Sequence, residues 1–217
     1  MILGKLPRDK HGKVVISVFI IYFAILVISY GFYPGAYSIL THAVSQLGSP
    51  VYNPKGWIFF SIAMIFAGIT LVPHVLYLFR QMSRKSFHFI DWLFLLTGLI
   101  GCAGLITLGL YDMHSEPGHG IATFMSFGSY AASCGLSAIR LLIDINAGKS
   151  TMKIWQWLLT FIPMAIVGVV SQIVTYIPEV LGALSETVWF EFFFWEWMGL
   201  FSLAIWLLGM YFAIKSS

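Results

Sequence analysis

The chain is dominated by long apolar runs that are separated by short polar segments. Six runs can be distinguished, at residues 14–34, 56–79, 92–111, 120–139, 154–178 and 192–214. Each is about as long as the roughly 20 residues that a helix needs to cross a bilayer. The segments between the runs are too short to form another domain. The pattern therefore predicts an all-α polytopic membrane protein, a six-transmembrane-helix bundle that forms a single domain over residues 1–217.

Composition supports a surface that faces lipid. The sequence is 59% hydrophobic and 10% charged, and its mean hydropathy is +0.87. A soluble domain has about a quarter of its residues charged, so this chain has too little charge to cover a soluble surface. No basic tract indicates nucleic-acid binding. The first run is longer than the core of a signal peptide and lacks a convincing cleavage site, which favours a retained anchor helix.

The basic residues give the bundle a direction. All 12 Lys and Arg residues except Lys55 fall on one side of the six predicted spans. Loops rich in Lys and Arg stay in the cytoplasm. The distribution predicts a multi-pass protein of the cell membrane whose N- and C-termini are both cytoplasmic.

Small residues are concentrated in two of the runs. Gly98, Gly101 and Gly104 recur in the run 92–111, and the run 120–139 is rich in Gly, Ala and Ser. Small side chains allow helices to approach closely in lipid, where packing replaces the hydrophobic effect. We therefore expect the run 120–139 near the centre of the bundle.

Histidines and acids gather on the opposite side from the basic residues. There the segment YSILTHAVSQLG, residues 37–48, would place Ser38, His42 and Ser45 on one face of a helix. This predicts a short amphipathic helix at the outer interface. It either stabilises the interface with its polar face in water, or covers a site with His42 and Ser45 directed inward.

A second polar segment on that side is the loop 111–120, YDMHSEPGHG. Its His114, Glu116 and His119 are ligand types that suit a divalent metal such as zinc, although their spacing matches no strong metal motif. Asp112 and His119 would also suit general acid–base catalysis. The alternative is a solvated loop whose acids cap a helix. The sequence does not determine whether a cofactor is bound.

Glu196 lies inside the last apolar run. A carboxylate within the hydrocarbon is costly, and such a residue usually faces the bundle interior with a partner or a role. Gln172, in the outer half of the fifth run, would line a polar pocket facing Glu196 or join helices by hydrogen bonds. The histidine at position 74 is expected to be a buried structural residue.

Two short motifs carry a resemblance to a known family. Residues 42–54, HAVSQLGSPVYNP, are similar to an I-S-x-L-G segment followed by Asn-Pro, and HGIATFMSF from His119 is similar to an H-x-x-A-x-x-x-x-F helix start. Both resemble an uncharacterised family of small archaeal and bacterial six-helix membrane proteins, a domain of unknown function. That family is distantly similar to eukaryotic proteins of GPI-anchor remodelling and autophagy modulation (the Frag/DRAM/Sfk group). Ser45 and His119 match the pattern, whereas Gln46 replaces an expected acid. The resemblance implies the fold and a connection with lipids, but no reaction.

Two hypotheses of function remain open. The first is a membrane-embedded hydrolase or transferase that acts on a lipid or lipid-linked substrate from the outer leaflet. Its catalytic residues would be His42, Asp112, His119 and Glu196, and its substrate contacts Ser38, Ser45 and Gln172. The second is a non-catalytic lipid-binding or scaffold protein. A small transporter ranks below both, because the inner halves of the third and sixth runs are apolar. Membrane lipids are the expected partners, and the sequence leaves the oligomeric state open.

Overall fold

The protein is a bundle of long helices. The computed structural model describes residues 7–84, 88–150, 152–176 and 192–215. Its elements are α1 (Arg8–Gly31), η1 (Val44–Gly48), α2 (Trp57–Ser83), α3 (Phe89–Leu110), α4 (Gly118–Thr123), η2 (Phe124–Gly128), α5 (Ser129–Asn146), α6 (Ile154–Tyr176) and α8 (Phe192–Lys215). All the regular secondary structure within these ranges is helical. This confirms the predicted all-α membrane fold.

Five helices are long and apolar enough to cross a membrane, over Asp9–Gly31, Trp57–Ser83, Phe89–Leu110, Ile154–Ser171 and Phe193–Phe212. The predicted run 120–139 corresponds to α4, η2 and α5, which follow one another without a break from Gly118 to Asn146. A π-helical turn, η2, interrupts the α-helical geometry there. The described part of the chain therefore has six long helical segments of the expected placement, one of them built from three pieces.

The helix ends are marked by recognisable local signals. His88 and Asp91 form a capping box at the start of α3, in which the Asp91 carboxylate accepts a hydrogen bond of 3.1 Å from the His88 backbone N–H. Beyond the end of α5, Gly148 takes a φ of +66°, a left-handed conformation that glycine adopts without steric cost. These signals fix the turns that bring α3 against α2 and α6 against α5.

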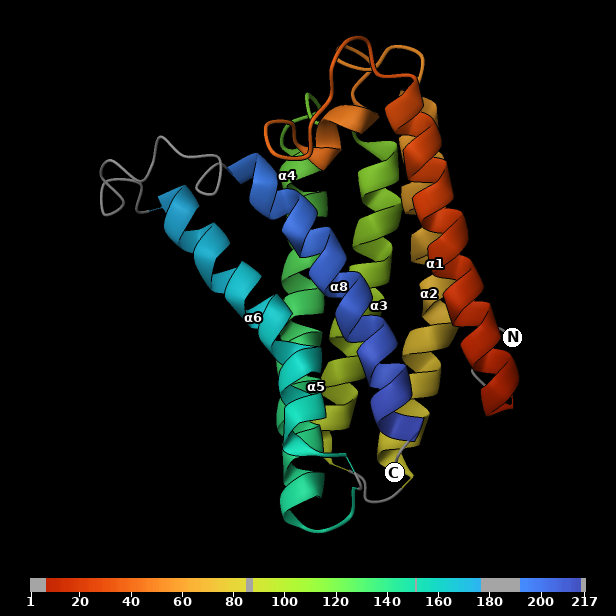
Figure 1. The fold of residues 1–217 in the computed structure, drawn as a ribbon, viewed down its shortest axis with the longest axis vertical. Helices are drawn as coiled ribbons and strands as arrows, with labels where there is room; N and C mark the ends of the chain where they lie inside the picture. The colour runs from red at the N-terminus through yellow and green to blue at the C-terminus, as the bar shows by residue number, and fades with distance from the viewer. Residues whose placement is uncertain (1–6, 85–87, 151, 177–191, 216–217) are drawn as a thin grey trace.

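The connection between α1 and α2 and the two termini lie at opposite ends of the bundle. The segment between α1 and α2, which contains η1, covers one end, and both termini lie toward the other (Figure 1). We call the first the cap end. The second, where α2 ends and α3 begins, we call the basic end. In the same view α8 crosses in front of α3, and α6 leans away from the bundle as it approaches the cap end.

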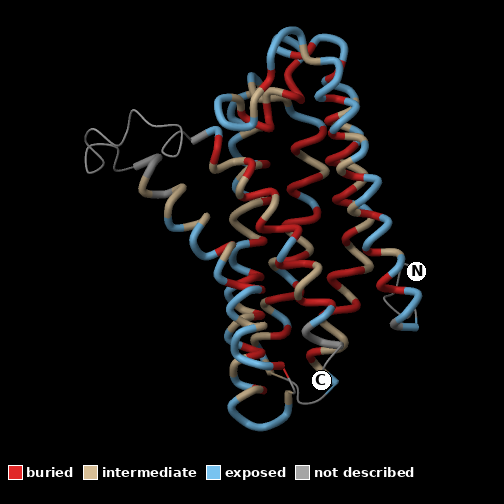
Figure 2. Tube along the Cα trace, in the orientation of Figure 1, coloured by how far each residue is buried: buried red, intermediate tan, exposed pale blue. Residues whose placement is uncertain are grey.

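Buried residues lie along the inward faces of the helices and exposed residues along their outward faces (Figure 2), and many of the exposed residues are large and apolar. Val27 is 66% exposed, Phe89 72% and Phe124 78%. So many exposed apolar groups on a long bundle fit an outer surface in contact with lipid chains. Inside, the helices approach closely at glycines: a Cβ on Gly104 of α3 would overlap the backbone of η2 at Ser126.

Candidate functional site

The motif HAVSQLGSPVYNP builds the cap end around one buried asparagine. The Asn53 side-chain amide donates to the backbone oxygens of Ser29 (3.0 Å) and Leu47 (3.1 Å), and its Oδ1 accepts from the Gly56 N–H (3.1 Å). Ser29 Oγ in turn donates to the Gly56 carbonyl at 3.0 Å. These four residues tie η1 to the end of α1 and the start of α2. This part of the motif is structural.

Glu196 meets Ser45 directly beneath the cap. The Glu196 carboxylate accepts hydrogen bonds from Ser45 Oγ (3.3 Å) and, at a longer 3.5 Å, from the Ser45 backbone N–H. Ser45 is buried in η1, while Glu196 lies in the second turn of α8. Two sequence candidates that are 151 positions apart are therefore brought into contact. A carboxylate at this depth requires such donors, because lipid supplies none.

His42 contributes its backbone carbonyl to this region, and its ring packs against Tyr37 with ring centroids 5.0 Å apart. Trp197 Nε1 donates to the His42 carbonyl and to Tyr37 Oη, both at 3.0 Å, and Tyr37 Oη donates to the Ala43 carbonyl at 2.8 Å. The His42 ring lies locally against Thr41, with Nδ1 2.9 Å from Thr41 Oγ1. Burial raises the pKa of Tyr37 above its ordinary value.

The expected amphipathic helix over residues 37–48 is wrong in its extent. Only Val44–Gly48 is helical, as a short 3₁₀ helix, and the preceding residues form turns. Ser38 donates its backbone N–H toward His42 Nδ1 at 3.4 Å, and its Oγ accepts from the Leu40 N–H at 3.2 Å. Ser38 thus stabilises the turn, and the structure does not place it beside Ser45 on a helix face.

The loop 111–120 is held by hydrogen bonds within the loop and by one contact to Ser49. Asp112 Oδ1 accepts from the His114 N–H (2.9 Å) and from Ser115 Oγ (2.8 Å). His114 Nε2 lies 3.1 Å from Ser49 Oγ, and His119 Nδ1 lies 3.3 Å from the Tyr111 carbonyl. Asp112 and His119 therefore stabilise a turn and the start of α4.

The predicted metal ligands do not gather. Among the residues that the structure describes, no three His, Cys, Asp or Glu side chains are placed to hold a metal ion. His114, Glu116 and His119 therefore form no such site, because the first two are exposed and each histidine bonds to a different partner. Gln172 lies in α6, but its side chain is outside the described part, as are Glu179, Glu186 and Glu191.

Below Glu196, a small apolar hollow with a cavity volume of about 20 Å³ lies between α1, α2, α3 and α8. We call it the central hollow; it is lined by Val18, Phe19, Tyr22, Ala67, Leu71, Leu105, Leu200, Leu203, Ala204 and Leu207. On α8, Glu196, Leu200, Leu203 and Leu207 are spaced by three or four residues, so they share one face of the helix. The carboxylate therefore lies about 6 Å along the axis from the first leucine.

A second hollow continues along α1 toward the basic end. It has a cavity volume of about 10 Å³ and shares Val18 and Leu71 with the central hollow. We call it the lower hollow. His11 and His74 are part of its lining, and His11 Nε2 lies 3.0 Å from His74 Nδ1. The sequence predicted a buried His74, but it placed His11 in an arm before the first helix rather than inside α1.

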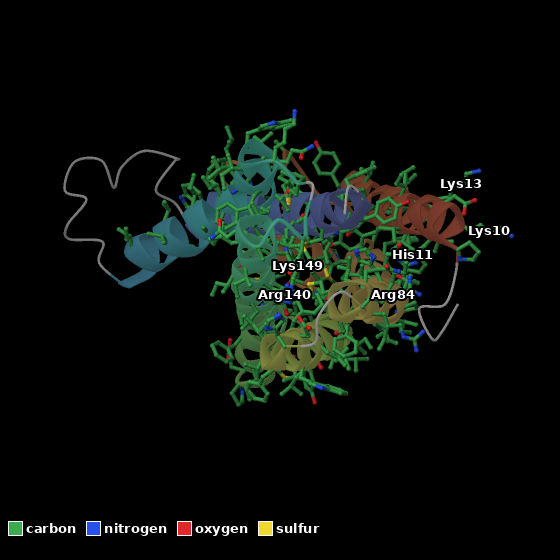
Figure 3. All side chains as sticks on the ribbon, turned by 90° about the horizontal axis from the view of Figure 1, so that it is seen from below. Lys10, His11, Lys13, Arg84, Arg140 and Lys149 are labelled. Carbon is green, nitrogen blue, oxygen red and sulfur yellow. The ribbon has the colours of Figure 1, made fainter. Side chains whose placement is uncertain are left out.

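A buried ion-pair network at the basic end was not predicted. Arg140 donates through Nε to Asp91 at 3.0 Å and forms an ion pair through Nη1 with Asp144 at 2.6 Å, and all three side chains are at most 5% exposed. Arg140 also donates to the Met82 carbonyl at 3.3 Å. The four-residue spacing of Arg140 and Asp144 was a signal that could have indicated it. In Figure 3, which views this end, Arg140 lies within the bundle, whereas Lys10 and Lys13 lie at its outer edge.

Comparison with known proteins gives a family but no activity. The family model "Protein of unknown function (DUF998)" matches residues 15–213, nearly the whole chain. No curated protein and no solved structure matches. The match bears out the resemblance to an uncharacterised membrane family, while the more distant likeness to the Frag/DRAM/Sfk group stays an expectation. The chain belongs to the DUF998 family of proteins of unknown function.

Proposed function

We propose that this chain binds a membrane lipid, with its tail packed against the apolar side chains that line the central hollow and its polar head group beside Glu196. The observation that carries this proposal is the shared face of α8, on which one carboxylate stands above Leu200, Leu203 and Leu207. An apolar hollow below a hydrogen-bond acceptor matches the two chemical halves of an amphiphile.

The head group would determine specificity. In a bilayer, a lipid tail gains little hydrophobic free energy by moving from other tails into an apolar hollow, because both surroundings are equally apolar. A carboxylate that is held by Ser45 selects groups that donate hydrogen bonds, such as hydroxyls and amines. We therefore expect lipids with hydroxyl or amine head groups to bind more tightly than lipids that offer only acceptors.

The orientation belongs to the same proposal. Lys10, Lys13, Arg84 and Lys149 are exposed at or near the basic end. The positive-inside rule then directs this end toward the cytoplasm in the cell membrane, together with both termini. Glu196 and the cap would accordingly face the outer leaflet.

The test is retention of lipid during purification. We expect native mass spectrometry of the protein in mild detergent to show a bound lipid, whose occupancy falls about tenfold in Glu196→Gln, since hydrogen bonds to a charged group contribute about 1.5–3 kcal/mol. Ala204→Leu, which fills the hollow, should also lower occupancy. Ala165→Leu adds the same group to an exposed position of α6 and should change nothing. Equal occupancy in all four proteins would refute the proposal.

An enzyme acting on such a lipid is the second candidate. The observation that favours it is the hydroxyl of Ser45 within 3.3 Å of the Glu196 carboxylate, a pairing that suits proton transfer during hydrolysis or group transfer. His42, Asp112 and His119 stay predictions for this activity, as does a divalent metal. Incubation with a lipid extract separates the candidates: a product that forms with the wild type and not with Glu196→Gln indicates catalysis, whereas unchanged lipids indicate binding alone.

A further inference from the structure

The helix α1 covers both hollows and is held at its two ends by different kinds of contact. At the cap end, Ser29 takes part in the hydrogen-bond network around Asn53. Toward the basic end, His11 pairs with His74. Between them the inward face of α1 packs mainly through apolar side chains, such as Val15 and Val18, which line the hollows. A change at His11 can therefore release one end of α1 while the other end stays in place.

The hydrogen bonds of the pair determine where its protons are. His74 Nε2 lies 3.2 Å from the Leu207 carbonyl, which can only accept, so this nitrogen carries the hydrogen. The other nitrogen of a neutral His74, Nδ1, then accepts a hydrogen bond from His11 Nε2 at 3.0 Å. The pair thus joins α1 to α2, and α2 to α8, when both rings are neutral.

The surroundings of the pair give a cation little solvation. His11 is 2% exposed and His74 1%. His11 stacks on Tyr77 of α2, with ring centroids 3.8 Å apart, and the Tyr211 ring of α8 lies 6.1 Å away. Thr70 completes the polar lining, and the charged residues nearest to His11 on α1 are Asp9, Lys10 and Lys13, whose side chains are exposed. No carboxylate of the described residues forms an ion pair with either ring, so a proton added to the pair creates a buried charge, which is costly.

We infer that the His11–His74 pair is a proton-operated latch that holds α1 over the hollows and regulates the entry of lipid. When His11 takes a proton from water, its imidazole carries an unsolvated charge against His74. His11 is in the first turn of α1, so it can reach the aqueous interface by a small movement of that end. Lipid then exchanges through the gap that opens between α1 and α8. The regulatory part of this inference rests on the proposed lipid binding, whereas the movement of α1 does not.

The experiment measures the movement and the exchange separately. Spin labels are attached to Ile16→Cys of α1 and Phe212→Cys of α8, which are both exposed positions. The native Cys102 and Cys134 are replaced by Ala so that they are not labelled. The labels report the distance between α1 and α8 in vesicles. We expect one distance at about pH 8 and an added longer population at about pH 5, around the ordinary histidine pKa. Because one proton drives the change, the ratio of the two populations should rise at most tenfold per pH unit.

Two substitutions of His11 serve as matched variants. His11→Gln keeps a donor near the position of Nε2 but cannot be protonated, so it should stay closed at both pH values. His11→Phe keeps the stacked ring but loses the hydrogen bond, so it should show the longer distance at both. A wild type that does not respond to pH, or a response of His11→Gln equal to that of the wild type, overturns the latch. If the distances behave as expected but fluorescent lipid neither binds nor exchanges, the latch stands and the proposed lipid binding fails.

Discussion

Arg140 shows how a single residue can join three helical elements at the basic end. Its guanidinium bonds to Asp91 at the start of α3, to Asp144 one turn later on α5, and to the Met82 carbonyl near the end of α2. Asp91 also caps α3. A buried ion pair is not a large net gain over an apolar core, but the loss of one partner leaves a buried charge. The network therefore makes the turn between α2 and α3 sensitive to mutation.

The first prediction concerns Asp91→Asn. Asparagine preserves the volume of the side chain and can still accept the capping hydrogen bond, but it removes one of the two carboxylates around Arg140. The free energy of unfolding should fall by about 3–5 kcal/mol, as found when buried pairs lose one partner. Asp9→Asn, on the exposed first turn of α1, is the control and should cost less than 1 kcal/mol. Denaturation in mild detergent measures both, and equal losses would contradict the proposed role of the network.

The second prediction concerns Tyr37 and alkaline pH. Its hydroxyl is buried and donates to the Ala43 carbonyl, and burial raises its pKa above the ordinary value. A raised pKa in the folded state means that the neutral phenol stabilises the fold. This stabilisation is complete below the unfolded pKa of about 10 and decreases as pH rises above it. Tyr37→Phe should cost about 1 kcal/mol at pH 8.

The difference in stability between the wild type and Tyr37→Phe is the quantity to measure, since the contributions of the other tyrosines cancel in it. We expect this difference to be constant from pH 7 to about pH 9 and to shrink at higher pH. Thermal unfolding followed by tryptophan fluorescence provides it. A difference that grows above pH 10 would show that Tyr37 is not held neutral by the cap.

At the scale of elements, the sequence predicted the long helices well and the short ones poorly. Charge-free apolar runs mark spans, because the interior of a bilayer excludes charge over a fixed thickness. The segment 37–48 instead depends on tertiary contacts: Tyr37, Ser45 and the backbone of His42 bond to α8, which lies about 150 positions away. Sequence periodicity contains no information about such partners. His11 was missed for a related reason, since Lys10 and Lys13 beside it resemble an extramembrane arm.

The same comparison applies to the candidate site. An intramembrane acid is conspicuous in a sequence, so Glu196 could be singled out, and the structure brings Ser45 to it. The predicted metal site of His114, Glu116 and His119 was based only on the proximity of these residues along the chain. The two histidines have different partners: His114 reaches Ser49 in the segment before α2, and His119 bonds within the loop to the Tyr111 carbonyl.

The third prediction tests the packing of α3 against η2. Only some of the small residues in the run 120–139 lie at the buried face: Ser126 and Ser133 are buried, whereas Ala131 and Gly135 are exposed. Gly104→Ala should destabilise the protein by about 1–3 kcal/mol, because the new methyl group would lie 2.6 Å from the Met125 carbonyl carbon. The control is Gly135→Ala, where a Cβ meets nothing within 4 Å.

In that control, alanine should stabilise the helix by up to about 1 kcal/mol through its higher helix propensity. Thermal unfolding in detergent compares the two variants, which both replace a glycine by alanine. We expect Gly104→Ala to lower the stability and Gly135→Ala to raise it. A Gly104→Ala protein as stable as the wild type would mean that η2 can move away from α3 without loss of packing.

At the scale of the whole molecule, the bundle has two chemically different ends. The cap end is closed by a network of neutral side chains around Asn53, with one carboxylate beneath it. The basic end carries exposed lysines and a buried ion-pair network. Between them, the hollows connect the neighbourhood of Glu196 to that of His11 along the inward face of α1. A lipid bound along these hollows would therefore contact residues near both ends of the bundle.

The fourth prediction concerns the direction of this axis in the membrane. If the basic end is cytoplasmic, Val51→Cys in the cap, at a position that is 69% exposed, should react with a membrane-impermeant thiol reagent in intact cells. Ala147→Cys, exposed after α5 at the other end, should react only after the membrane is permeabilised. The native Cys102 and Cys134 are buried and provide the background. Labelling of Ala147→Cys first would invert the topology and would place Glu196 in the inner leaflet, where the lipids available to the central hollow differ.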